Sequence, residues 1–192
     1  MKKRIKVGAK NKAFASAEHI RVVPLHYPQP TISAGAQLTY RNGPLIRNVE
    51  LFTVFWGTLW GSTPNSTDLM NRLNQFFTDI LVSPLIDQLA EYDVPGQAIG
   101  HGSFIGTKII SDNAPVGSVT DSAINTQLEQ WIAAGTLPTN NENSLYFIYL
   151  DPGIVSIMGG SRSCQSYCGY HNNVGTIYYG VMPYPTCSGC LG

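Results

Sequence analysis

The sequence predicts an α/β protein, with α+β as the neighbouring possibility, in which two main helices pack against a mixed sheet. Short apolar and aromatic runs that stop at Gly, Pro or Asp are typical of buried strands. Two longer segments instead repeat apolar residues at helical spacing. Along the chain these segments follow the order strand, helix, strand, helix, strand, strand, without an internal repeat.

The first half of the domain is predicted to hold one strand and two helices. The aromatic and β-branched run Leu51 to Trp56 predicts a strand that is buried on both faces. Thr67 is the expected N-cap of a helix, because apolar residues between Leu69 and Leu81 recur on one face. Ser83 and Pro84 predict the start of a second, short helix, since Ser caps helix N-termini and Pro suits the first helical position.

The second half is predicted to hold three strands and one helix. The segment from Ile99 to Ser111 contains three glycines among apolar residues, which indicates an extended, bulged strand. A helix is predicted from Asp121 to Ala134, where apolar residues line one face. The apolar runs Leu145 to Leu150 and Thr176 to Met182 predict strands, the first of them ending in the turn sequence Asp151 to Gly153.

The charge distribution divides the chain into an irregular basic arm at residues 1–40 and a single domain at residues 41–192. Six of the twelve basic residues occupy the first twelve positions, so the rest of the chain holds six basic and twelve acidic residues. A mildly acidic body argues against a nucleic-acid partner, which requires clustered Lys and Arg. No apolar run approaches the roughly 20 residues of a membrane-spanning helix, and no signal peptide is visible.

Composition favours a secreted or cell-wall protein over a cytosolic enzyme. Only 12% of the residues are charged, against about 25% in an average soluble protein. The four cysteines lie near the end of the chain as Cys164-x3-Cys168 and Cys187-x2-Cys190. Two close pairs at this spacing are compatible with disulfides, with a four-thiolate zinc site or with redox-active thiols, and we expect disulfides. Spacing does not determine which cysteines are paired.

Histidine and serine are the other residue types that could carry chemistry. His19 and His26 lie in the arm, and His101 lies between two glycines. His171 is the better candidate for a catalytic role, because it follows Cys168 closely and a bridged cysteine would fix its position. The sequence around Ser161 approaches the nucleophile motif G-x-S-x-G but has Ser in place of the final Gly.

A family resemblance rests on four features in order. These are Gly43-Pro44-Leu45 before an aromatic strand ending at Gly57, the Ser83-Pro84 break, the strand at 145–150, and Cys168-Gly169-Tyr170-His171. Together they resemble the EXORDIUM, or phosphate-induced, protein family and its microbial relatives over roughly residues 43–190. In those relatives the Cys-rich turn leads into a helix bearing His-Glu-x-x-Glu. The resemblance therefore implies a secreted protein with a zincin-like metallopeptidase plan.

The resemblance assigns no catalytic residue to this chain, because no His-Glu pair occurs in these 192 residues. The expected metal-bearing helix would begin near Gly192, so we expect the domain to be truncated there and inactive alone. No metal ligand is assigned within the chain, and zinc is implied by the family only. Cys164 and Cys168 are expected to be bridged. The strand from Tyr178 to Tyr184 is the expected sheet edge for an extended peptide substrate.

Two other functions remain open. The first is a non-catalytic cell-surface or cell-wall module that binds carbohydrate through the aromatic rings of Tyr178, Tyr179 and Tyr184, with Tyr170 nearby. The second is a serine-type hydrolase that uses Ser161 or Ser103 with His171 and Asp151. If a central helix is missing, an uncovered apolar sheet face predicts a homo-oligomer or another covering partner.

Overall fold

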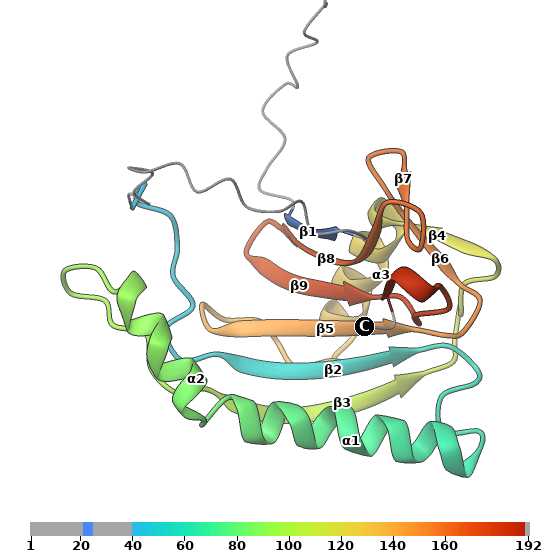
Figure 1. The fold of residues 1–192 in the computed structure, drawn as a ribbon, viewed down its shortest axis with the longest axis horizontal. Helices are drawn as coiled ribbons and strands as arrows, with labels where there is room; N and C mark the ends of the chain where they lie inside the picture. The colour runs from blue at the N-terminus through green and yellow to red at the C-terminus, as the bar shows by residue number, and fades with distance from the viewer. Residues whose placement is uncertain (1–20, 25–39, 191–192) are drawn as a thin grey trace, which may run out of the picture.

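The protein forms a six-stranded mixed sheet with helices on both faces, here in a computed structural model that describes residues 21–24 and 40–190 (Figure 1). The strands in sheet order are β1 (Arg21–Pro24), β8 (Tyr167–Val174), β9 (Ile177–Met182), β5 (Ser144–Leu150), β2 (Glu50–Trp56) and β3 (Ser103–Ile110). A smaller sheet contains β4 (Ser118–Thr120), β6 (Val155–Met158) and β7 (Ser161–Arg162). The helices are α1 (Pro64–Ile80), α2 (Pro84–Asp87) and α3 (Asp121–Ala133), with 3₁₀ helices η1 (Gln88–Tyr92) and η2 (Ser188–Cys190). The expected mixed α/β fold with two main helices is confirmed.

Four neighbouring strands of the sheet are parallel, and their order reverses at β2. In sheet order they are β3, β2, β5 and β9. β2 comes first of these four in the chain, and the later strands β3 and β5 lie on either side of it. β8 then runs antiparallel to β9, and β1 runs antiparallel to β8. This order places a topological switch point between the carboxyl ends of β2 and β5.

Two apolar cores hold the helices against opposite faces of the sheet. Alternate residues of β2 point to opposite sides, because successive side chains of a strand alternate. Val54 packs in one core with Leu128 of α3, and Phe55 packs in the other with Phe77 of α1. Thr53 is also buried on the α1 side, where its hydroxyl bonds Asn74 Oδ1 at 2.7 Å.

The predicted helix at Thr67 begins four residues earlier in the structure. Thr63 is the N-cap of α1, and its side chain accepts the Ser66 N–H while the Ser66 hydroxyl accepts the Thr63 N–H. This reciprocal capping box, followed by a proline at the first helical position, fixes the start of α1. The short helix capped by Ser83 is confirmed.

The later elements agree with the sequence-based expectations in type. β3 contains the expected bulge, since its register against β2 shifts between Leu51 and Phe52. The predicted helix is α3, and the two predicted late strands are β5 and β9. The strands β4, β6, β7 and β8 were absent from the prediction. β4, β6 and β7 contain only two to four residues, too few for a strand pattern, and the eight residues of β8 include His171, Asn172 and Asn173.

One expectation about the arm is wrong. Residues 1–40 were expected to be irregular, but Arg21–Pro24 forms β1 and pairs with β8. The six basic residues at the start of the arm and the histidines at positions 19 and 26 lie outside the described residues. None of the helices in the described part of the chain combines the length and apolar character needed to cross a bilayer.

Candidate functional site

The carboxyl ends of β2 and β5 meet at the switch point, where open α/β sheets bind ligands. The last residues of the two strands, Trp56 and Leu150, are register partners. The next residue after β5, Asp151, is buried and accepts hydrogen bonds from the backbone N–H groups of Thr58 at 2.6 Å and Leu59 at 3.0 Å. Asp151 therefore anchors the loop between β2 and α1 to the end of β5.

Gly57 is needed at this junction because of its position against Asp151. A Cβ atom at Gly57 would overlap the Asp151 carboxyl group, which fills the space beside the loop. The glycine and the aspartate thus act together to set the path of the chain from β2 towards α1. Sequence analysis placed Gly57 at a strand end and Asp151 in a turn and in the possible serine-hydrolase triad, and did not predict the contact between them.

A cavity of about 280 Å³ lies beside this loop. Two aromatic residues, Trp60 and Tyr184, line it, with ring centroids 6.2 Å apart. The polar lining comes from neutral side chains of the loop and the first turn of α1, namely Ser62, Thr63, Asn65 and Ser66. The remaining lining is apolar, so the cavity is suited to a neutral ligand with both a hydrophobic face and hydroxyl groups.

Trp60 has a further property that bears on this cavity. The residue is 6% exposed, and its indole Nε1 is buried without a hydrogen-bond partner among the described residues. An indole N–H is a donor only, and leaving a buried donor unpaired costs about 1 to 3 kcal/mol. An acceptor that reached this nitrogen would remove that cost.

The three tyrosines expected to bind substrate lie in three different places. Tyr184 lines the cavity beside Trp60. Tyr178 lies at the opposite end of the parallel strands, in a second cavity of about 370 Å³ with Arg47 and Glu142, which form an ion pair at 3.0 Å. Tyr179 is fully buried in the α3-side core, so its ring is not available to a ligand.

Tyr179 instead belongs to a buried cluster around Asp121 at the start of α3. Asp121 Oδ1 accepts the hydroxyls of Tyr179 at 2.7 Å and Tyr170 at 2.8 Å, and Oδ2 accepts the Asn172 amide at 2.9 Å. Burial, reinforced by the Asp121 carboxylate, raises the pKa of both tyrosines. This cluster joins α3 to β8 and β9. The rings of Tyr170 and Tyr179 are buried in it and are therefore not available to bind carbohydrate.

The expected peptide-binding edge is also misplaced. β9, the strand that begins the segment from Tyr178 to Tyr184, pairs with β5 on one side and with β8 on the other, so it lies inside the sheet. The edge beyond β9 is β8, and β1 already pairs with it. An antiparallel extended segment is therefore present at this side of the sheet, one strand further out than expected.

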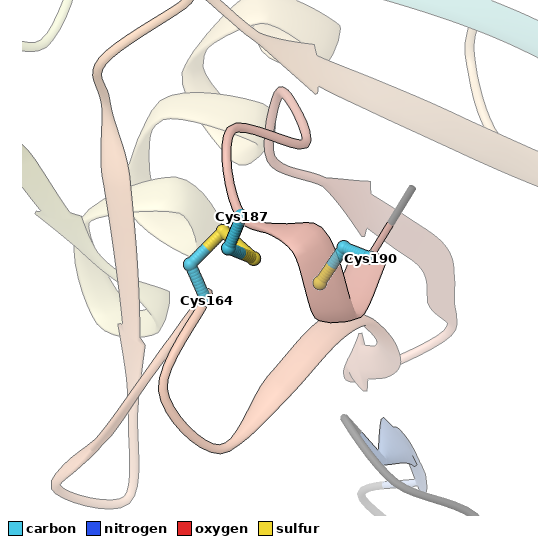
Figure 2. Close-up of side chains that lie close together, drawn as sticks. All are labelled: Cys164, Cys187 and Cys190. Carbon is cyan, nitrogen blue, oxygen red and sulfur yellow. A yellow bond between two sulfur atoms is a disulfide. The ribbon is translucent and has the colours of Figure 1, made fainter. Parts of the chain in front are cut away.

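The four cysteines form two disulfides, which confirms the expected disulfides and establishes their connectivity. Cys164 is bonded to Cys187 and Cys168 to Cys190, with Cα–Cα distances of 5.6 and 5.4 Å. Both bridges connect the turn before β8 or its first residues to the segment after β9, and Figure 2 shows the bridge between Cys164 and Cys187. Disulfides are typical of proteins in oxidising compartments, which is in keeping with an extracellular protein.

The histidines are not brought together. His171 lies on the exposed surface of β8, opposite Gly180 of β9. His101 lies before β3 and its Nε2 is 2.8 Å from Asp87 Oδ1 at an exposed position. Neither residue contributes to the cavity beside Trp60.

The serine-hydrolase arrangement is not assembled in the structure. Ser103 begins β3 opposite Glu50, at the other end of the parallel strands from Asp151. Ser161 belongs to the smaller sheet, and the Asp151 carboxylate is engaged by two backbone N–H groups. Ser103 and Asp151 are therefore too far apart to belong to one triad, and the Asp151 carboxylate is already bound by the loop after β2.

The described residues also do not fit a peptidase zinc. Such a site needs nitrogen and oxygen ligands from His and acidic residues, with one position left open for water. Within the described ranges, the one group of three or more potential ligand residues with suitable spacing is Cys164, Cys187 and Cys190, whose sulfurs belong to disulfides. We therefore derive no catalytic step through zinc from these residues.

Comparison with known proteins adds no assignment to this geometry. No family model, curated protein or solved structure matches the chain. The features that bear on function are therefore the sheet edge, the cavity beside Trp60 and the resemblance described above.

Proposed function

We propose that this chain is the substrate-binding sheet of a secreted zinc-metallopeptidase-like protein, and that it has no peptidase activity alone. The observation that carries the proposal is the pairing of β1 with β8. A segment from the arm adds to the sheet as an extended antiparallel strand, with Arg21 opposite His171 and Val23 opposite Gly169. A peptidase substrate is held in the same way when its main chain pairs with a sheet edge.

The α1 side of the sheet supports the same proposal. Figure 1 shows α1 running along β3 and β2, while no described helix lies in front of β9. Met182 of β9 lies on this side and is half-buried, and Tyr178 lies on the same face of β9 because side chains alternate along a strand. A further helix, such as the metal-bearing helix that the resemblance implies, would find an apolar surface there. In its absence, the same surface would favour association with a second copy.

The first experiment is to read the gene beyond the codon for Gly192 and to express the longer product. We expect the sequence to continue into His-Glu-x-x-Glu, and the longer protein to hold one zinc ion and to hydrolyse casein until a chelator is added. The 192-residue chain is the matched control and should be inactive. A stop codon after Gly192, or zinc-independent hydrolysis by the 192-residue chain, would contradict the proposal.

A second experiment tests the sheet edge directly in the 192-residue chain. Val22→Pro and Val23→Pro each remove one backbone N–H from β1. In an antiparallel pair, only one of two adjacent residues directs its N–H towards the partner strand, so only one of the two variants removes a hydrogen bond to β8. One variant should therefore expose β8, increase hydrogen exchange in residues 167–174 and bind a labelled peptide of residues 17–28 more tightly than the parent. Equal exchange in the parent and both variants would argue that β1 does not occupy a peptide-binding edge.

A second candidate function is the binding of neutral carbohydrate in the cavity beside Trp60. The aromatic pair Trp60 and Tyr184 offers a face for a sugar ring, the neighbouring hydroxyls suit its polar groups, and the unpaired Trp60 N–H lacks an acceptor. Oligosaccharide titrations followed by tryptophan fluorescence test this function. We expect Tyr184→Ala to abolish the response and Tyr178→Ala, in the other cavity, to leave it unchanged. Equal responses in both variants would exclude this cavity.

A further inference from the structure

Three of the four cysteine sulfurs form a cluster near the start of β8. The Sγ atoms of Cys164, Cys187 and Cys190 all lie within 4.8 Å of one another. Cys168 Sγ is not one of this group of three, but it is bonded to Cys190 Sγ and so lies beside the cluster. Figure 2 shows Cys164 facing Cys187 across their disulfide, with Cys190 beside them on η2. The two disulfides are therefore neighbours rather than separate staples.

The spacing of the three clustered sulfurs is close to that in a four-thiolate zinc site. With Zn–S bonds of about 2.3 Å, the sulfurs of a tetrahedral site are about 3.8 Å apart. Cys190 Sγ lies within 4.8 Å of both sulfurs of the Cys164–Cys187 bridge, so it needs to move by only about 1 Å relative to them. Cys168 Sγ, released from Cys190, would supply the fourth ligand. The two sulfurs of each broken disulfide would separate to the same distance.

The backbone around the cluster also suits a metal site. Cys187 and Cys190 are held on one tight turn, because the Cys190 N–H donates to the Cys187 carbonyl at 3.0 Å. The other two ligands come from the turn and first residues of β8, so each half of the site is a short segment with two cysteines. The Thr186 hydroxyl, 3.7 Å from Cys164 Sγ, is placed to donate to a thiolate.

We propose that the paired disulfides and a four-thiolate zinc site are alternative states of this cluster. Reduction of each disulfide by a trialkylphosphine consumes one water and yields two thiols and one phosphine oxide. Binding of one Zn²⁺ to the four thiols then releases four protons, because the metal ligand is the thiolate. The disulfides prevail in an oxidising compartment and the zinc site forms in a reducing one. This site is separate from any peptidase zinc and does not depend on the proposed function.

The test uses the full 192-residue chain, reduced anaerobically with a water-soluble phosphine and then titrated with Co²⁺. We expect one Co²⁺ per chain, the charge-transfer and d–d absorption of tetrahedral cobalt thiolate, and displacement by Zn²⁺. The unreduced chain should bind no cobalt in this way. Cys190→Ser should weaken binding at least about ten-fold, which is about 1.4 kcal/mol. The matched control Ser188→Ala, within the same turn, should bind like the parent.

Two results would overturn the inference. The first is a reduced chain that keeps its far-UV circular dichroism and binds no cobalt, or that binds it equally well after Cys190→Ser. The second result applies if the chain loses its structure on reduction. Adding Zn²⁺ to the reduced chain should then restore the far-UV signal, and a signal that stays low would show that no zinc site forms. Neither result involves peptide hydrolysis, so the peptidase proposal is tested separately.

Discussion

The carboxylate of Asp151 gives the sharpest prediction, because it is buried and bonds two backbone N–H groups of the loop that carries Trp60. Asp151→Ala leaves the Thr58 and Leu59 donors without their acceptor at a site that is 6% exposed. A hydrogen bond to a charged group contributes about 1.5 to 3 kcal/mol, so the two bonds together contribute about 3 to 6 kcal/mol to the free energy of unfolding. Both N–H groups donate to Oδ2, so Asp151→Asn can still accept both bonds through its one amide oxygen and should lose less than Asp151→Ala.

The assay is urea unfolding followed by tryptophan fluorescence, with the slope of the free energy against urea checked for equality among variants. The matched control is Asp93→Ala, since Asp93 Oδ1 also accepts one backbone N–H, from Ile99 at 2.6 Å, but at an exposed position. We expect the control to lose about 1 kcal/mol or less. If the two alanine variants lost the same free energy, the anchoring role of Asp151 would be refuted.

Three further predictions concern the cores and the disulfides. Asp121→Ala leaves two buried tyrosine hydroxyls without an acceptor and should cost about 2 kcal/mol or more of unfolding free energy; a loss below about 0.5 kcal/mol in urea unfolding would contradict it. Replacing Cys164 and Cys187 together by serine opens a loop of 23 residues, which should cost up to about 3 kcal/mol in the same assay, and unchanged stability would argue against this bridge. Burial raises the pKa of Tyr146 to about 12, above its usual value of about 10. The unfolded chain then loses this proton at a lower pH than the folded protein, so the contribution of Tyr146 to the unfolding free energy should be constant below about pH 10 and fall between about pH 10 and 12; an equal fall in Tyr146→Phe would contradict this.

The elements that sequence predicted well are those whose own apolar pattern shows how they are buried. β2 and β5 are continuous apolar runs because helices cover both faces, and α3 shows its stripe because one face contacts the sheet. β8 was missed because its sequence mixes aromatic residues with His171, Asn172 and Asn173. Two of its polar and aromatic side chains are satisfied by Asp121, a contact across about fifty positions that no local pattern reveals.

The candidate site shows the same limit. Tyr178 and Tyr179 are neighbours in sequence, but the alternation along β9 sends one ring to a surface cavity and the other to the core. Sequence could have indicated Tyr184 and Trp60 only as exposed or strand-end aromatics, since the contact between them depends on the switch point. The cysteine spacing predicted bridges, whereas their pairing followed from the placement of η2 against β8.

The pairing of β1 with β8 has a consequence for synthesis of the protein. Arg21 and His171 are separated by 150 positions, and at a translation rate of about 5 to 20 residues per second roughly 8 to 30 seconds pass between them. During that interval the amino-terminal segment has no partner strand, and the outer side of β8 does not yet exist. This seam of the sheet therefore cannot close until residues 167–174 have left the ribosome, so a nascent-chain pulse assay should find β1 protease-sensitive until β8 has emerged.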